Sequence, residues 1–190
     1  MAEFQLGGAL SGAELRERVR ARMAEFGGAL RVLAENLLGA DAAIDWVAVD
    51  AQGQVALVLL GLPGQELELI ATGIAQRAWV GARLKDWLQL APNLGLRPEA
   101  KVRLLLLGAA FDGTARQAAS ALGDAVELWT YRCLRDGGAG VDIFLERIPP
   151  GAHRSSLRSQ APPAASTFRS DLSDAKLGLS PAERAEFEGG

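Results

Sequence analysis

Apolar residues recur at steps of three and four through the first part of the chain: Leu15, Val19, Met23, Phe26, Leu30, Leu33 and Leu37. This spacing predicts a helix with one continuous apolar stripe. A capping box, Ser11-Gly-Ala-Glu14, places the helix start at Ser11. The glycine pair at 27–28 is expected to kink or split the helix. We interpret the stripe as core packing, with a dimer seam as the alternative.

The pattern changes to that of a hairpin at Ile44. Isoleucine, valine and Trp46 predict a strand over 44–50, the stretch 50–53 (Asp-Ala-Gln-Gly) predicts a turn, and 55–60 predicts a second strand. The second strand is apolar on both faces, which is typical of a central strand covered by helices on both sides. We therefore expect it at the middle of a sheet.

Helices and strands alternate up to residue 148. The pattern predicts helices over 68–90 and 113–122, and strands over 101–107, 125–134 and 141–148. The first of these helices is expected to face inward with Ile70, Ile74, Ala78, Leu84 and Leu88. This order of elements predicts an α/β fold, with a mixed central sheet flanked by helices.

Hydrophobic periodicity ends near residue 148. Residues 149–190 are rich in proline, serine and alanine, and predict a largely irregular tail with a short helix from Ser180 to about Phe187. We divide the chain into an N-terminal helical segment that packs on the core (1–38), an α/β core (39–148) and this tail (149–190). Because an irregular segment with a short amphipathic helix can dock into a groove, residues 151–190 are a candidate for binding a protein partner.

The amino-acid composition argues against several classes of function. The 20 Lys and Arg residues against 23 Asp and Glu give a net charge of −3, so there is no global attraction to nucleic acid. A single cysteine, Cys133, excludes an intramolecular disulfide and is interpreted as a core strand residue. His153 is the only histidine, which leaves a catalytic triad unsupported. No apolar run approaches the roughly 18 residues that span a bilayer, and we expect a cytoplasmic protein.

Candidate chemistry is concentrated at the 44–60 hairpin. Magnesium-dependent phosphodiesterases need carboxylate ligands and a nearby lysine, because the metal neutralises the phosphate and activates a water. An Asp at the start of one strand and Glu-x-Lys at the end of the next supply this geometry, since residues two apart on a strand face the same side. Here Asp45 is in place, but the other two positions hold Leu59 and Gly61.

In this layout the chain resembles the PD-(D/E)XK (restriction endonuclease-like) nuclease superfamily. The resemblance covers about residues 30–148, through 33–61 (LAENLLGADAAIDWVAVDAQGQVALVLLG), 70–84 (IATGIAQRAWVGARL) and 101–134 (KVRLLLLGAAFDGTARQAASALGDAVELWTYRCL). It implies a restriction endonuclease-like core. It also implies that Asp45 matches the first metal-binding Asp and that Glu35 lies near the acidic position of the family's first helix. The family's glutamine and tyrosine positions on the next helix hold Thr72 and Gln76.

Losing the second carboxylate and the lysine removes metal ligands and transition-state charge stabilisation. We therefore expect a pseudo-nuclease without a cofactor, which serves as a structural, protein-binding or regulatory module. A DNA-binding protein that uses the cleft without cleavage is one alternative. Its basic residues would be Arg77, Arg83, Lys85, Arg97, Lys101 and Arg103.

A divergent nuclease with relocated ligands is the second alternative. It would bind Mg²⁺ through Asp45, Glu66 and Glu68, with Lys85 as the lysine. Magnesium is expected only in that case. Among partners, we expect a protein, keep a homodimer and DNA as alternatives, and expect no membrane.

Overall fold

The computed structural model describes residues 5–6, 10–136 and 140–149. These residues form a seven-stranded sheet: β1 (Gln5–Leu6), β2 (Arg31–Leu38), β3 (Ala43–Val49), β4 (Val55–Leu60), β5 (Arg103–Gly108), β6 (Val126–Asp136) and β7 (Gly140–Ile148). The α-helices are α1 (Gly12–Ala21), α2 (Glu66–Leu90) and α3 (Gly113–Ala121), with 3₁₀ turns η1 (Met23–Phe26), η2 (Pro92–Leu94) and η3 (Gly123–Ala125). None of the described helices is both long and apolar enough to cross a membrane. The tail beyond Pro149, with His153 and the helix expected at 180–187, lies outside the described residues.

The sheet is mixed, as the order of elements predicted. Strands β2, β3 and β4 form an antiparallel meander, and β4, β5 and β6 run parallel. Helices α2 and α3 provide the two crossovers between the parallel strands, which is the usual βαβ connection. At the far side, β6 pairs antiparallel with both β7 and β1. The expected α/β class is confirmed.

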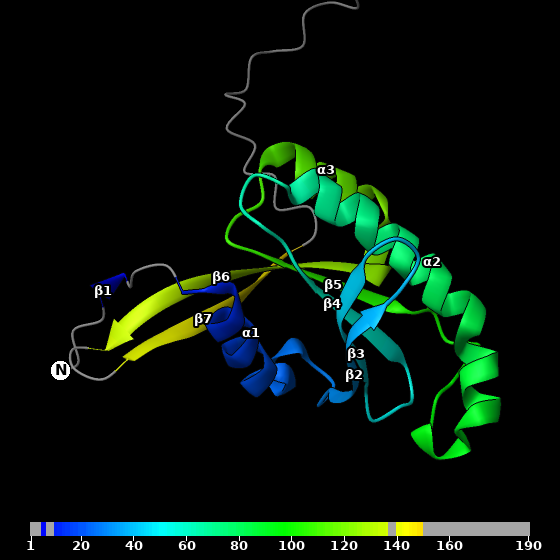
Figure 1. Cartoon of the computed structure of the whole chain (residues 1–190). Coiled ribbons are helices and arrows are strands. Elements are labelled where there is room, and N and C mark those ends of the chain that lie inside the picture. The colour runs from blue at the N-terminus through cyan, green and yellow to red at the C-terminus, as the bar shows by residue number, and fades with distance from the viewer. Residues whose placement is uncertain (1–4, 7–9, 137–139, 150–190) are drawn as a thin grey trace, which may run out of the picture. The chain divides into compact units, whose positions relative to one another are not determined.

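Helices cover both faces of the sheet (Figure 1). On one face α2 and α3 enclose a core cluster with Leu57, Leu59 and Leu104, and on the other α1 and η1 enclose a cluster with Val58 and Leu105. Successive side chains of β4 and β5 alternate between the two clusters, as the strand period requires. Strand β4 is therefore the buried central strand that its apolar sequence predicted.

The N-terminal segment departs from the expected helix. The capping box is confirmed, because the Glu14 N–H donates to the Ser11 hydroxyl at 3.2 Å and the Glu14 carboxylate accepts the Ser11 N–H at 2.9 Å. The helix nevertheless ends at Ala21, and residues 31–38 form β2, so the prediction of a helical segment over 1–38 was wrong for its last part. Two glycines and an alanine at 27–29 have positive φ angles, which a helix cannot accommodate. The apolar spacing does not form one stripe across this break, because Leu30 belongs to the cluster beneath α1 whereas Leu33 and Leu37 pack against the cluster beneath α2.

Most of the stripe itself is core. Leu15, Val19, Met23 and Phe26 are buried against the sheet face formed by Trp46 and neighbouring strand residues. The core interpretation is confirmed for them, and they provide no seam for a second copy.

The inward face of α2 was placed incorrectly in part. Ile70 and Leu84 are buried as expected, but Ile74 and Ala78 are exposed. The buried face instead centres on Gly73, Gln76 and Val80. At Gly73 a β-carbon would lie 2.8 Å from a methyl carbon of Leu104, so the glycine allows α2 to approach β5 closely. Sequence spacing alone did not show which of two apolar faces would turn to the sheet.

Candidate metal site at the end of the central hairpin

Asp45 lies in β3, beside the carboxyl end of β4. Its Oδ2 accepts a hydrogen bond from the Leu60 N–H at 2.8 Å, and its Oδ1 lies 2.5 Å from Nη2 of Arg16. The carboxylate is buried, with 8% of the side chain exposed. Burial raises the pKa of Asp45, and the hydrogen bond from Leu60 and the charge of Arg16 partly oppose this. Both carboxylate oxygens are thus engaged by the protein itself.

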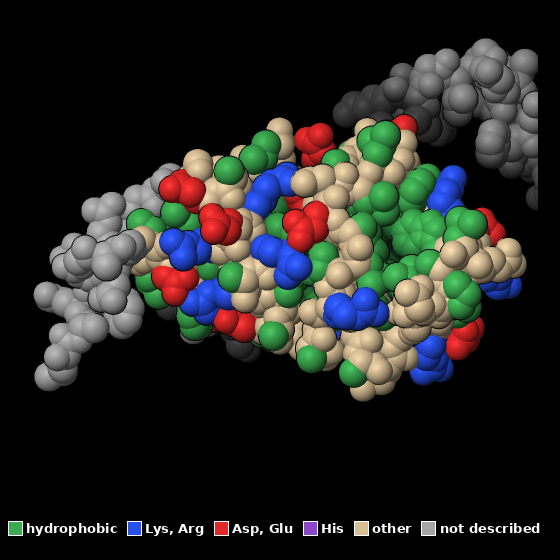
Figure 2. Space-filling model, turned by 60° about the horizontal axis from the view of Figure 1, so that its bottom comes forward, with side chains coloured by type: hydrophobic (Ala, Val, Ile, Leu, Met, Phe, Trp, Pro, Cys, Tyr) green, Lys and Arg blue, Asp and Glu red, His purple; other side chains and the backbone are tan. Residues whose placement is uncertain are grey.

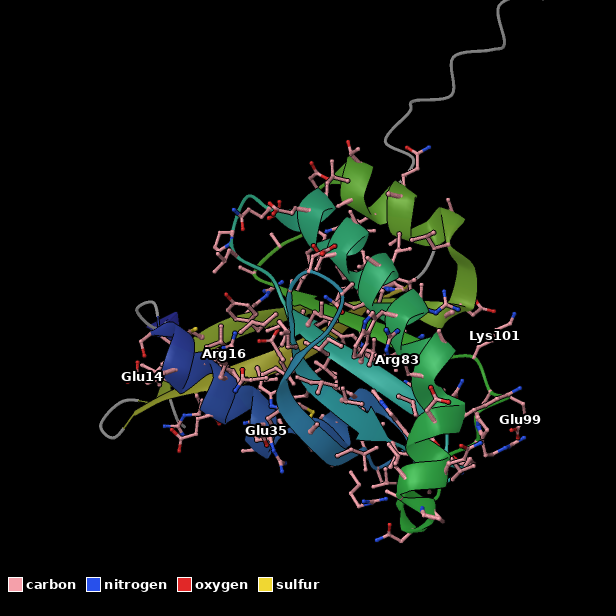
Figure 3. All side chains as sticks on the ribbon, turned by 45° about the vertical axis from the view of Figure 1, so that its right-hand side comes forward. Glu14, Arg16, Glu35, Arg83, Glu99 and Lys101 are labelled. Carbon is pink, nitrogen blue, oxygen red and sulfur yellow. The ribbon has the colours of Figure 1, made fainter. Side chains whose placement is uncertain are left out.

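Two arginines one turn apart on α1 pair with the two acidic candidates. Arg16 contacts Asp45 and also donates to the Asn36 side-chain oxygen at 2.7 Å, while Arg20 pairs with Glu35 at 2.5 Å. Because residues four apart lie on the same side of a helix, α1 presents both guanidinium groups to this end of the sheet. Figure 3 shows Arg16 and Glu35 on the side of the sheet that α1 covers. The structure therefore brings these acids beside arginines.

The Glu-x-Lys positions are filled by core packing. Leu59 is 3% exposed and belongs to the cluster beneath α2. The Gly61 N–H donates to the Leu107 carbonyl at 2.8 Å, which extends the β4–β5 pairing by one residue. A β-carbon at position 61 would lie 2.6 Å from Cδ2 of Leu69. Since real β-carbons essentially never approach another atom so closely, a lysine at position 61 would require Leu69 to move.

The structure does not bring together the residues expected as ligands of a relocated metal site. The Glu66 carboxylate accepts the Gly64 N–H at 3.0 Å, and Glu68 is exposed in the first turn of α2. Lys85 lies 17 residues beyond Glu68, roughly 25 Å along the helix at 1.5 Å per residue. Among the described residues, no three His, Cys, Asp or Glu side chains form a group that could hold a metal ion. The residues present do not fit a magnesium site, because Mg²⁺ needs several oxygen ligands with free lone pairs.

Gln76 has a structural function that the sequence did not reveal. Its side chain is 1% exposed, accepts the Ala40 N–H at 3.0 Å and donates to the Ala42 carbonyl at 2.8 Å. Gln76 thereby joins α2 to the loop between β2 and β3. A β-carbon on Gly39 would lie 1.7 Å from the Gln76 amide oxygen, so this contact requires glycine. A glutamine on the buried face of a helix was the available signal. Thr72, at the other substituted position, is only partly exposed.

A buried ionic cluster lies at the opposite end of the parallel strands. Glu127, 7% exposed, pairs with Arg103 at 2.7 Å and with Arg147 at 3.2 Å. Arg103 also donates to the Phe26 carbonyl at 3.3 Å, which ties η1 to β5. These contacts satisfy the buried carboxylate from two neighbouring strands, and the cluster is therefore a structural element of the sheet.

Three of the other basic residues make contacts within the protein. Arg77 donates to the Val102 carbonyl at 2.8 Å, Arg97 pairs with Glu99 at 3.2 Å, and Arg83 stacks 4.1 Å above the Trp79 ring. In Figure 3, Arg83 lies on α2 and Lys101 lies on the loop that follows this helix. The three arginines thus make contacts within the protein.

Comparison with protein-family models and with characterised proteins gives no match. Among solved structures, a repair endonuclease from Pyrococcus abyssi is similar over 64% of this chain and 47% of its own, with 11% identity and a TM-score of 0.48. The structure of an EndoMS complex with double-stranded DNA is similar over 62% of this chain and 44% of its own, with 17% identity and a TM-score of 0.37. The chain spans less than half the length of either structure. These are similarities of chain arrangement, and they do not assign the chain to a family.

Proposed function

We propose that this chain is a non-catalytic α/β module that acts by binding other proteins. The observation that carries the first part is the packing at Gly61, where any β-carbon would lie 2.6 Å from Cδ2 of Leu69, so that a side chain at this position would require Leu69 to shift. Leu59, two residues earlier, is part of the core and supplies no ligand. Each missing group of this kind commonly costs a few kcal/mol of transition-state stabilisation.

The state of Asp45 supports the same conclusion. A carboxylate binds magnesium through free oxygen lone pairs, whereas this one accepts a backbone N–H and pairs with Arg16. For these reasons we assign Asp45 a structural function.

An apolar hollow supports the binding part of the proposal. Leu33, Leu37, Trp79 and Trp87 are partly buried at the margin of the core cluster beneath α2. The two tryptophan rings pack edge to face, 6.3 Å apart. Figure 2 shows hydrophobic side chains gathered in a hollow on the right-hand side of the molecule, where α2 lies in Figure 1. Partly exposed tryptophans are typical of protein-binding surfaces.

A cleavage assay tests the catalytic part. The full chain and an Asp45→Ala variant are incubated with supercoiled plasmid and either Mg²⁺ or Mn²⁺. We expect no cleavage above the buffer control for either protein. Divalent-ion-dependent cleavage that disappears in Asp45→Ala would refute the proposal. Titration of a DNA duplex at low salt is expected to show no binding, and salt-sensitive binding would favour the DNA-binding alternative.

Affinity capture tests the binding part. The full chain is compared with an Arg83→Glu variant, which changes the charge beside the hollow, and with a chain that ends at residue 150. The matched control is Lys101→Glu, an equal change of charge at an exposed loop residue. We expect a specific protein to be lost with Arg83→Glu or with the tail, and retained with the control. An identical set of captured proteins from all four samples would contradict protein binding through either surface.

A further inference from the structure

Helix α1 and turn η1, residues 12–26, form an arm that covers one face of the sheet (Figure 1). Four apolar side chains of the arm are buried against this face: Leu15, Val19, Met23 and Phe26. The buried residues around them come mainly from β3, β4, β5, β6 and β7, all of which follow the arm in the chain. The arm is therefore packed by residues that lie beyond its own connection to the sheet.

The polar contacts of the arm follow the same pattern. Arg16 pairs with Asp45 on β3, and Arg22 pairs with Asp142 on β7, which lies 120 positions further along the chain. The carbonyl of the last residue of η1 accepts a hydrogen bond from Arg103 on β5 at 3.3 Å. Each of these contacts depends on the folded sheet and none involves the connection between the arm and β2. The arm of a second copy could therefore make all of them.

The connector between the arm and β2 is exposed and strained. Gly27, Gly28 and Ala29 have φ angles of 79°, 81° and 49°, and all three residues are exposed. Glycine adopts such angles readily, whereas an alanine is disfavoured there by about 5- to 30-fold. The Ala51 N–H donates to the Gly28 carbonyl at 3.4 Å, which is long for a hydrogen bond. An extended connector would release the strain at Ala29 and lose little else.

We propose that the chain forms a dimer in which two copies exchange their arms through an extended 27–29 connector. Each arm then covers the sheet of the other copy, so its apolar side chains stay buried. Arg16 of one copy pairs with Asp45 of the other, and the second copy thus contributes a residue to each candidate site. The arm is the segment that already covers this face, and an identical arm fits it equally well. The exchange is independent of whether the Asp45 region is catalytic.

Release of the strain favours the exchange twice in each dimer. Two alanines that leave the left-handed region raise the association constant by about 30- to 1000-fold relative to an unstrained connector. The buried side chains of the arm must leave the sheet before two arms can exchange. We therefore expect monomer and dimer to interconvert slowly, on the time scale of unfolding.

Refolding at a series of protein concentrations tests the proposal. The full chain is refolded from urea at about 1 to 500 µM, held until the dimer fraction is constant, and analysed by size-exclusion chromatography with light scattering. We expect a dimer whose fraction rises with concentration.

Substitutions in the connector should shift this equilibrium in opposite directions. Ala29→Gly removes the strain at an exposed position and should lower the association constant about 30-fold. Gly27→Ala adds strain and should raise it by a similar factor. Gly64→Ala is the matched control, because Gly64 also has a positive φ angle, of 82°, and a β-carbon there, as at Gly27, would have no atom within 4 Å. The control should leave the association constant unchanged.

A mixing experiment shows whether the arms are exchanged. Arg20 on the arm pairs with Glu35 on β2, and both side chains are 47% exposed, so either charge can be reversed without disturbing the core. Arg20→Glu and Glu35→Arg each place like charges at this contact, whereas a mixed exchanged dimer has opposite charges at both contacts. When equal amounts of the two variants are refolded together, mixed dimers should exceed their statistical share of about one half. Ion-exchange chromatography separates the three dimers by charge.

Three results would each overturn the proposal: a monomer at every concentration of the original chain, an Ala29→Gly dimer as tight as the original, or mixed dimers at the statistical share. A Gly64→Ala effect as large as that of Gly27→Ala would do the same, since the shift would then not depend on the connector. Circular dichroism confirms that each variant is folded.

Discussion

The buried carboxylate of Asp45 leads to a prediction about stability that follows from its burial and its two contacts. Asp45→Asn keeps an oxygen that can accept the Leu60 N–H and removes the charge. The variant loses the ion pair with Arg16, whose side chain is 45% exposed, so solvent screening limits that loss to about 1 kcal/mol or less. It also removes the cost of burying a charge. We therefore expect the free energy of unfolding of Asp45→Asn at pH 7 to lie within about 1 kcal/mol of the original.

Asp45→Ala separates the hydrogen bond from the charge. Alanine leaves the Leu60 N–H without its acceptor, and an unsatisfied buried donor costs about 1–3 kcal/mol. Urea denaturation followed by tryptophan fluorescence measures all three proteins under the same conditions. We expect the original protein and Asp45→Asn to be about equally stable, and Asp45→Ala to be less stable than both.

The pH dependence of stability shows whether the charge of the Asp45 carboxylate stabilises or destabilises the fold. Because the folded pKa of Asp45 is raised, its contribution to stability is fully present below the unfolded value, about pH 4, and is lost as pH rises through the folded pKa. The difference in free energy of unfolding, original minus Asp45→Asn, should therefore be most favourable at low pH and fall as pH rises. A difference that grows with pH would show that the ionised carboxylate is stabilising and would refute the reasoning. A loss above about 2 kcal/mol in Asp45→Asn at pH 7 would do the same.

Three further substitutions test the packing and polar contacts around the sheet. Gly61→Ala should cost about 1–3 kcal/mol, and Leu69→Ala in the same chain should relieve part of that cost, which a double-mutant cycle measures. Gln76→Ala should cost about 2–4 kcal/mol and speed amide exchange at Ala40, because a buried N–H and a carbonyl lose their partners. Glu127→Gln should cost about 2–3 kcal/mol in thermal or urea unfolding, since it removes the carboxylate shared by two arginines.

Each of these substitutions has a matched control. Gly12→Ala introduces a β-carbon with no atom within 4 Å, Gln89→Ala changes an exposed glutamine of the same helix, and Glu146→Gln removes a carboxylate from a largely exposed pair. All three should change the free energy of unfolding by no more than about 0.5 kcal/mol. A test substitution that costs no more than its control would show that the corresponding contact does not contribute to stability.

The sequence predicted the secondary structure correctly at those positions where its pattern is compatible with few structures. The apolar run of β4 could only be a central strand or a buried helix, and its length with the preceding turn decided for the strand. The capping box at Ser11 fixed a helix start because both of its hydrogen bonds are local. The end of that helix could not be read in the same way. Positive φ angles at 27–29 end the helical region, and the apolar residues beyond it divide between the two faces of the sheet, with Leu30 on one face and Leu33 and Leu37 on the other.

The residue types of the candidate site could be predicted from the sequence, but the contacts that those residues make could not. The apolar residues at positions 59 and 61 could be read directly from the sequence, and the structure places Leu59 in the core. The sequence did not show that Asp45 would meet Arg16, or that Gln76 would bind a loop 34–36 residues away, because such pairings depend on how the chain packs. Similarly, the apolar residues of α2 indicated a helix but not which face would be covered, and Ile74 was placed on the wrong side.

The pairing of α1 with the acidic edge has a consequence for any attempt to introduce a nuclease site into this chain. Such a site would need Arg16 withdrawn from Asp45, Leu69 reduced in size, a lysine at 61 and a carboxylate at 59. Each change taken alone breaks an ion pair, opens a cavity or buries an unpartnered charge, so the early steps lower stability before any rate is gained. Stability alone therefore favours keeping the present arrangement, whatever surface the protein now uses.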